Sequence, residues 1–256
     1  MKKILIILCL LIVLSSCNVT SKSEFENLLS NYPHNSDYLK EYELEFNQTK
    51  NIVYAINKVN YPNFLTPRSS QYLAFKTNNI WLVNTNYRLS SGYVPKDLIK
   101  VENVDYIKRE NQQMLINNKA FEAYKKLYEA SLLENLELMI FSAYRSYEYQ
   151  ENLYKKEDNN YVAQPGASEH QTGMAIDIAK PSTGLTNHFD NTPEAKWLEN
   201  NAYKFGFIQR YPKDKEHITG YPYESWHYTF VGESVAENIK SKNITLEEYL
   251  YQYILL

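Results

Sequence analysis

The pattern of apolar and polar positions along the chain predicts a mixture of helices and short strands. Between Lys119 and Leu133, small and apolar residues recur three and four positions apart, as on one face of a helix; they are Ala120, Ala123, Tyr124, Leu127 and Ser131. Further helices are predicted over residues 52–59, 145–156 and 194–205, and from Gly232 onward. Short apolar runs predict strands at 78–85, 136–144, 174–179, 206–211 and 225–231. These elements follow no regular strand–helix–strand repeat, so we expect the α+β class with a small, mostly antiparallel sheet.

The first 17 residues are typical of an export signal. Lys2 and Lys3 precede an apolar run over residues 4–14, which is shorter than the roughly 20 residues that a membrane span needs. The run ends in "LSSC", which resembles a bacterial lipobox, a motif whose cysteine is lipidated and becomes the first mature residue. Cys17 would then carry two acyl chains, enough for stable anchoring. We therefore expect an extracytoplasmic lipoprotein on the cell membrane; the alternative is an ordinary cleaved signal with an incidental cysteine.

Composition constrains the chain beyond residue 17. Residues 18–36 are polar without sustained periodicity, so we interpret them as a flexible tether, and residues 37–256 as one domain. Cys9 and Cys17 are the only cysteines, so the mature domain has no disulfide. Without Lys2 and Lys3, 27 basic residues fall to 25 against 30 acidic ones, a net charge near −5. This balance argues against nucleic acid as a partner. We expect a monomer.

Two of the five histidines lie in contexts that suggest metal binding. His170 precedes Asp177 by seven residues, and Gly173 between them would let the chain turn so that both reach one point. Asp177 alternates with isoleucines in the predicted strand and therefore faces the opposite side from them. A buried carboxylate there is costly unless it binds a cation or pairs. Taken singly, each residue has an ordinary structural interpretation, as a core histidine, a cap or a salt-bridge partner.

A second segment supplies the remaining candidates. His227 follows Glu224 by three positions, and residues three apart in a regular strand face opposite sides. Both side chains reach one metal only if a turn or bulge intervenes at Ser225. Two histidines, one carboxylate and an open fourth position are typical of catalytic zinc, with Glu224 as the general base. Non-haem iron oxygenases also use two histidines and a carboxylate, but usually with the first two ligands one residue apart.

The combined motifs resemble the VanY-type family of zinc D-alanyl-D-alanine carboxypeptidases. The resemblance is carried by Ser168-x-His170-x-x-Gly173-x-Ala175-x-Asp177 and by Glu224-x-Trp226-His227. It extends to the segments "WLVNTNYRLSSGYVPKDLIKV" and "FSAYRSYEYQ", and to the stretch from "KFGFIQRY" to "HYTFVG". It implies a hedgehog/D,D-peptidase-like fold, with helices flanking the sheet and zinc in an open cleft.

By position, the resemblance also implies roles for individual residues. His170, Asp177 and His227 would bind one zinc ion per chain, and Glu224 would be the base. Arg145 aligns with the arginine that holds the substrate's terminal carboxylate, a pairing that suits a guanidinium fork. Ser168 and Gln150 align with polar substrate contacts. The structural alternatives are a surface salt bridge for Arg145, a loop cap for Ser168 and a surface amide for Gln150.

The chain departs from the family pattern at two positions. Ser225 stands where the family usually has proline, and Thr229 stands where it often has arginine. The first change loosens the turn that aims Glu224, and the second leaves out an arginine that would either support the metal ligands or form a surface ion pair. Neither removes a ligand or the base, so an active enzyme is expected.

The activity implied by the resemblance is removal of the C-terminal D-alanine from peptidoglycan stem pentapeptides. Ser168 has no Ser-x-x-Lys or Gly-x-Ser-x-Gly context, so no nucleophilic serine is expected. One alternative is an L,D-carboxypeptidase that trims the tetrapeptide, because relatives with this motif set do either. Another is a cell-wall-binding module that keeps zinc without chemistry, but such a module needs no base like Glu224.

Overall fold

The computed structural model describes residues 23–30, 34, 36–50, 52, 55–56, 59, 75–77, 80–110, 112–156 and 162–254. The predicted export signal and Cys17 lie outside the described residues. Among the residues that are described, no helix combines the length and the apolar character that crossing a membrane requires.

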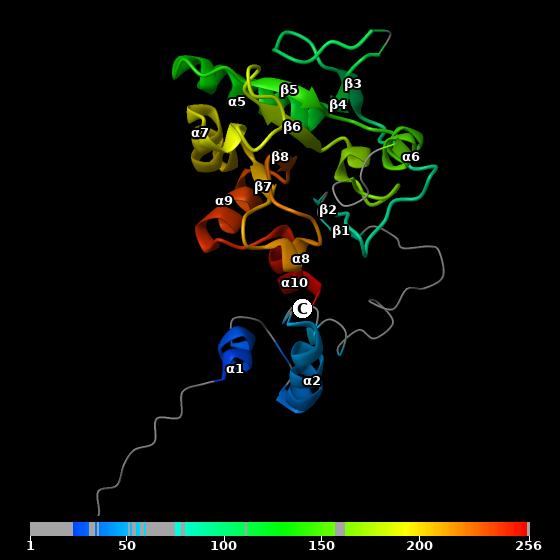
Figure 1. The fold of residues 1–256 in the computed structure, drawn as a ribbon, viewed down its shortest axis with the longest axis vertical. Coiled ribbons are helices and arrows are strands. Elements are labelled where there is room, and N and C mark those ends of the chain that lie inside the picture. The colour runs from blue at the N-terminus through cyan, green and yellow to red at the C-terminus, as the bar shows by residue number, and fades with distance from the viewer. Residues whose placement is uncertain are drawn as a thin grey trace, which may run out of the picture.

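A four-stranded antiparallel sheet forms the centre of the molecule (Figure 1). Its strands are β5 (Met139–Ser142), β6 (Ala175–Ala179), β7 (Phe207–Tyr211) and β8 (Glu224–Phe230), in the spatial order β5-β6-β8-β7. All three pairings are antiparallel. Two short hairpins lie outside this sheet: β1 (Phe75–Thr77) with β2 (Ile80–Leu82), and β3 (Leu98–Lys100) with β4 (Leu115–Asn117). The predicted α+β class and the antiparallel sheet are confirmed.

Helices α5 (Asn118–Leu133) and α7 (Pro193–Asn201) contribute to the main hydrophobic core. The α5 face predicted from the sequence is buried at Ala120, Tyr124, Leu127 and Ser131. This face packs with Ile176 and Ile178 of β6 in one cluster. Because side chains alternate along a strand, the other face of β6 is left for Asp177. The helices therefore cover the side of the sheet away from the predicted metal ligands.

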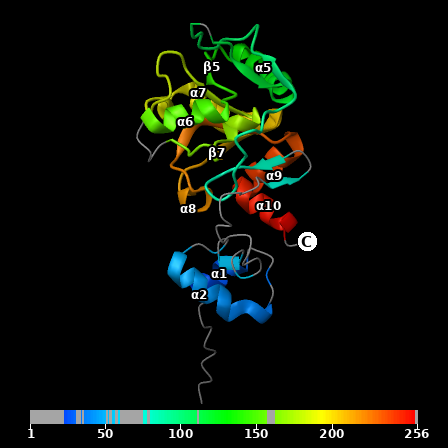
Figure 2. The ribbon, with the colours of Figure 1, turned by 90° about the vertical axis from the view of Figure 1, so that its right-hand side faces the viewer.

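A second core lies where the C-terminal helices pack on the sheet. Helices α9 (Glu233–Lys242) and α10 (Leu246–Ile254) bury Ala236, Ile239, Leu246 and Leu250 against Leu82 and Ile208. Figure 2 shows both helices beside the β1–β2 hairpin. This packing connects β7 to segments well outside the central motifs.

The remaining helices are short. Helix α6 (Tyr147–Lys156) begins after Ser146, whose Oγ accepts a hydrogen bond from the backbone N–H of Tyr149 at 3.1 Å and so caps the helix. Helix α8 (Glu216–Thr219) lies between β7 and β8. Helix α7 continues as a 3-10 helix over Ala202–Phe205, within the predicted helical range.

Part of the predicted tether is helical. Helix α1 (Glu24–Leu29) has a capping box between Ser23 and Glu26, and it buries Phe25 and Leu29. These side chains form a separate small core with α2 (Leu39–Thr49) and with Ile52, Ala55 and Ile56. This helix lies inside residues 18–36, the segment interpreted as a flexible tether, where the spacing of Phe25, Leu28 and Leu29 suits one helical turn.

Candidate metal centre

His170, Asp177 and His227 converge, as the sequence predicted. Asp177 in β6 and His227 in β8 are directly opposite each other in the antiparallel register. His170 lies in the 3-10 helix η2 (Glu169–Thr172), immediately before β6. One nitrogen or carboxylate oxygen from each residue lies within 4.8 Å of the others, and all three residues are buried. The sheet and the preceding turn thus bring together ligands that are distant in sequence.

Gly173 forms the turn between the first two ligands. Its φ is +71°, a left-handed conformation that glycine adopts without steric cost, and its N–H donates to His170 O at 3.1 Å. A Cβ at this position would lie 2.8 Å from Leu98 Cδ2 and 3.2 Å from the backbone nitrogen of Asn117. Conformation and close approach both require glycine here, in agreement with the sequence interpretation.

Each histidine places one ring nitrogen close to a carboxylate oxygen of Asp177. His170 Nε2 lies 3.2 Å from Asp177 Oδ2, and His227 Nδ1 lies 3.1 Å from Asp177 Oδ1. Ligands bonded to zinc at about 2.1 Å in a tetrahedron are roughly 3.4 Å apart. His170 Nδ1 lies 2.6 Å from Ala143 O, which accepts its proton and leaves Nε2 available for a metal. His170 Nε2 is buried and makes no hydrogen bond to any described residue. These residues fit a zinc ion.

Glu224 lies beside the three ligands without being one of them. Its Oε2 is 3.7 Å from His227 Nδ1. Gln209 of β7 pairs with Tyr228, but Tyr211 pairs with Glu224, so Arg210 alone faces three residues of β8. This bulge turns Glu224 and His227 toward the same side. The irregularity predicted around Ser225 is confirmed, although the usual proline is absent.

The ionisable groups of the metal-free site shift one another's pKa. Burial raises the pKa of Glu224 to about 7, against the opposing charges of His227 and Arg145. Burial also lowers the pKa of His170 to about 4, with Arg145 adding to the effect and Asp177 opposing it. For His227, the nearby carboxylates of Asp177 and Glu169 outweigh burial and raise the pKa to about 9. The same two histidines hold the pKa of Asp177 well below its usual range despite burial.

Arg145 lies at the entrance to α6, next to the metal ligands. Its backbone N–H donates to His170 O at 3.2 Å, and its charge contributes to the pKa shifts of His170 and Glu224. The side-chain Nε is buried and forms no hydrogen bond within the described part of the chain. A guanidinium with an unused donor beside a metal site can hold an anionic group of a ligand.

Ser168 and Gln150 are both buried. Ser168 lies at the start of η2, where its carbonyl accepts from the Gln171 N–H at 3.2 Å. The side chain of Gln150 donates from Nε2 to Ala163 O at 2.7 Å and so holds the segment before Ser168. Gln150 is not the surface amide of the structural alternative, since its relative exposure is 1%. The substrate contacts expected of both residues stay predictions.

A buried ionic network behind His227 was not anticipated from the sequence. Glu169 accepts from Arg210 Nε at 2.6 Å through Oε1 and from Thr229 Oγ1 at 2.5 Å through Oε2. Arg210 also donates to both carboxylate oxygens of Glu247. Thr229, which stands where the family often has arginine, thus takes part in a charged network. The arginine of that network is Arg210, on the neighbouring strand β7. The available signal was an arginine inside the apolar run "GFIQRY", where a charge needs a partner.

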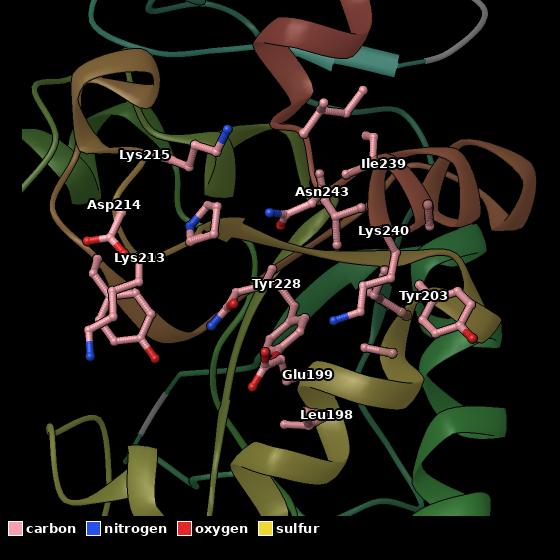
Figure 3. Close-up of a pocket in the computed structure, with 18 of the residues that line it drawn as sticks. Leu198, Glu199, Tyr203, Lys213, Asp214, Lys215, Tyr228, Ile239, Lys240 and Asn243 are labelled. Atoms are coloured by element: carbon pink, nitrogen blue, oxygen red, sulfur yellow. The ribbon is translucent and has the colours of Figure 1, made fainter.

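The metal ligands do not line the cavity shown in Figure 3, which has a volume of about 520 Å³. Tyr228 follows His227 in β8, so its side chain points to the opposite face of the sheet. The cavity is lined from α7, the 3-10 helix that follows it, β7, the loop after β7 and α9, by residues that include Glu199, Tyr203, Lys213, Lys240 and Asn243. The metal site and this cavity therefore lie on different faces of the sheet.

Comparisons with known proteins agree with this geometry. A family model described as "VanY: D-alanyl-D-alanine carboxypeptidase" matches residues 113–233, a range that holds all three metal ligands, Glu224 and Arg145. The putative carboxypeptidase YodJ of Bacillus subtilis (strain 168) is 42% identical over 183 residues, which cover 67% of this chain and 67% of that protein.

Two solved structures extend the similarity to the fold. The LdcB LD-carboxypeptidase has 38% identity and a TM-score of 0.64, over 71% of this chain and 94% of that one. A mutant of the vancomycin resistance D,D-pentapeptidase VanY, in complex with Zn(II), has 30% identity and a TM-score of 0.54, over 66% of this chain and 97% of that one. The fold is thus that of the VanY and LdcB peptidases, as expected.

Proposed function

Because the chain belongs to the VanY family of D-alanyl-D-alanine carboxypeptidases, we propose that it is a zinc enzyme that removes the C-terminal D-alanine from peptidoglycan stem pentapeptides. The observation that carries this proposal is the convergence of His170, Asp177 and His227 with a carboxylate that is not a ligand, Glu224. A binding module without chemistry would have no use for that carboxylate. Zinc is favoured by the donor set and by the Zn(II) complex of the VanY neighbour.

The residues of the chain divide the catalytic work. Bound zinc would supply a water activated for attack at neutral pH and an electrophile for the scissile carbonyl. Glu224 accepts the proton of the attacking water and passes it to the leaving amine. Burial raises its pKa to about 7 in the absence of metal, and a zinc ion nearby would favour the ionised carboxylate that accepts this proton.

Arg145 makes the enzyme an exopeptidase. Its guanidinium binds the free carboxylate of the last substrate residue and so sets that residue's amide bond against the metal. An internal peptide bond offers no such carboxylate. The buried Nε of Arg145 without a hydrogen bond to the described chain supports this assignment.

A second candidate activity is that of an L,D-carboxypeptidase, which removes D-alanine from the tetrapeptide. The observation in its favour is the similarity to the LdcB LD-carboxypeptidase, which exceeds that to the VanY D,D-pentapeptidase in both identity, 38% against 30%, and TM-score, 0.64 against 0.54. The metal site and base serve either reaction. The two activities differ in the residue that precedes the released D-alanine.

We further propose that the chain is an extracytoplasmic lipoprotein, held on the membrane by lipidated Cys17, and acts as a monomer. The signal-like residues 1–17 and the "LSSC" motif support the anchor. An enzyme tethered outside the membrane can reach the stem peptides of the wall. Metabolic labelling with a fatty acid, compared between the wild type and Cys17→Ala, tests the anchor.

The deciding experiment uses the full chain, purified in detergent and loaded with zinc. It is incubated separately with stem pentapeptide and tetrapeptide, and alanine loss is followed by mass spectrometry. Loss from the pentapeptide alone supports the D,D activity, and loss from the tetrapeptide alone supports the L,D activity. The absence of loss from either peptide by a zinc-loaded chain would refute the proposed enzyme.

A further inference from the structure

A line of buried charges runs from the C-terminal helix α10 to the metal ligand His227. We propose that Glu169 is a positioning residue for His227, and that Arg210 and Glu247 hold Glu169 in place. The inference rests on the proposed zinc site, and it adds residues whose roles are not explained by ligation, base catalysis or substrate binding.

Glu169 is placed to act on His227 from behind. Its Oε2 lies 3.6 Å from His227 Nε2, the ring nitrogen that faces away from Asp177. The same oxygen accepts the Thr229 hydroxyl at 2.5 Å, and Oε1 accepts Arg210 Nε at 2.6 Å. The side chain of Glu169 is 1% exposed, so protein groups rather than water determine its orientation.

Arg210 connects Glu169 to two segments beyond the family match at residues 113–233. Its Nη1 and Nη2 donate to the two carboxylate oxygens of Glu247 in α10, at 2.8 and 2.5 Å. Asn84 Nδ2, after β2, donates to Glu247 Oε1 at 3.1 Å. Arg210 is fully buried, and its three nitrogens are all used. These contacts fix the orientation of the Arg210 guanidinium, and the guanidinium in turn fixes the orientation of the Glu169 carboxylate.

The chemistry of a histidine ligand explains the arrangement. If His227 binds metal through Nδ1, the atom beside Asp177, its proton must reside on Nε2. A buried N–H needs an acceptor, yet Nε2 makes no hydrogen bond to the described residues, and Glu169 Oε2 is the nearby carboxylate oxygen. A carboxylate there fixes the tautomer and the ring orientation and makes the ligand more basic.

The charges of the network also suit a cation. One guanidinium against two carboxylates leaves a net charge of −1 behind the imidazole, which favours a positive ion at its far nitrogen. Burying three charges is a costly way to fix a strand in place, because apolar residues of similar volume often stabilise a protein at least as much as buried ion pairs do. A role toward the metal ligand accounts for that cost.

The test compares zinc affinities of the full-length wild type, E169Q, E247Q and E248Q, by competition with a chromophoric chelator. We expect E169Q, which removes the negative charge behind His227, to bind zinc about 10–100-fold more weakly, as is typical when the partner of a metal ligand is mutated. E247Q should weaken binding less, in the same direction. Glu248 is the matched control, because it is the neighbouring glutamate in helix α10 and its carboxylate accepts from the Thr245 N–H and pairs with Lys215.

A second readout is the imidazole N–H of His227 in the zinc-loaded protein. A hydrogen-bonded Nε2 proton should appear in ¹H–¹⁵N spectra of the wild type and shift or disappear in E169Q. Zinc affinity of E169Q within twofold of the wild type would overturn the proposal, as would equal losses in E169Q and E248Q. If E169Q does not fold, E247Q decides in the same way. A wild-type chain that binds no zinc overturns the proposed function together with this inference.

Discussion

At the scale of single residues, the neighbours of each ionisable group decide its chemistry. Glu224 and Asp177 are both carboxylates near His227, yet their pKa values shift in opposite directions. Asp177 lies between two imidazoles that stabilise its charge. The side chain of Glu224 is 20% exposed. The loss of water around its carboxylate raises the pKa more than the attraction of His227 lowers it. One carboxylate is thereby suited to metal binding and the other to proton transfer.

We predict that Glu224→Gln abolishes most activity and leaves metal binding intact. The amide cannot accept the proton of the attacking water, so kcat should fall about 10²–10⁴-fold. Zinc content, measured by atomic absorption, should stay at one ion per chain, since Glu224 is not a ligand. His227→Ala is the contrasting variant and should lose zinc. Activity of Glu224→Gln within tenfold of the wild type would rule out Glu224 as the base.

A second prediction concerns acid stability. Arg210, His227 and Thr229 outweigh burial and lower the pKa of Glu169 to about 2. An unfolded glutamate has a pKa of about 4.3, so this stabilisation is present above pH 4.3 and is lost as the pH falls toward 2; fully lost, it amounts to about 3 kcal/mol. When urea unfolding is followed from pH 7 to 3 without metal, the free energy of unfolding should fall more steeply for the wild type than for Glu169→Gln. Parallel curves would contradict the prediction.

At the scale of elements, two irregularities of the backbone build the site. The left-handed turn at Gly173 returns the chain from η2 into β6, and the bulge in β8 brings Glu224 beside His227. Regular strands would separate both pairs, because their side chains alternate between faces. The site therefore depends on where regular structure is interrupted.

Gly173→Ala should impair both stability and metal binding. An alanine at φ +71° is strained by roughly 1–2 kcal/mol, and its Cβ would press on Leu98 and the Asn117 backbone. Thermal unfolding should report the lost stability, and chelator competition should report weaker zinc binding as His170 shifts. Gly92→Ala is the control, since no atom lies within 4 Å of its added Cβ. If both variants behave like the wild type, the turn does not position the ligands.

At the scale of the whole molecule, the sheet separates the helices that stabilise it from the residues of the metal site. Helices α5 and α7 pack against one face, and the metal ligands lie on the other. The C-terminal core of α9 and α10 holds Glu247 where Arg210 can reach it. The metal ligands thus lie on elements that these two cores hold in place, so metal should stabilise the folded state without being needed to create it.

Zinc removal should lower the melting temperature without unfolding the chain at 25 °C. A ligand that binds only the folded state stabilises it by about 4 kcal/mol at 1,000 times its Kd. Calorimetry of the protein with zinc, and after dialysis against a chelator, checks this. Asp177→Asn should melt at nearly the same temperature with and without zinc. A wild type whose melting is insensitive to zinc would argue against the site.

The sequence by itself determined the residues of the site and most of the elements. The helix at 119–133 and the strands around Asp177 and His227 are local patterns, because apolar periodicity and turn chemistry act over a few residues. The resemblance to the VanY-type family singled out Arg145, which no local pattern marks. The need for a bulge near Ser225 followed from strand alternation alone. The helix in residues 24–29 was missed because it spans less than two turns and a mostly polar segment hides its spacing.

Only the tertiary structure decided what supports the ligands. Glu169 and Arg210 are 41 residues apart, and Arg210 and Glu247 are 37 apart, so no local pattern pairs them. The ring nitrogen that each histidine turns toward Asp177 likewise depends on distant partners, Ala143 O for His170 and the Glu169 carboxylate for His227. Such contacts form when strands pair and helices pack, because buried polar groups take the partners that the fold brings to them.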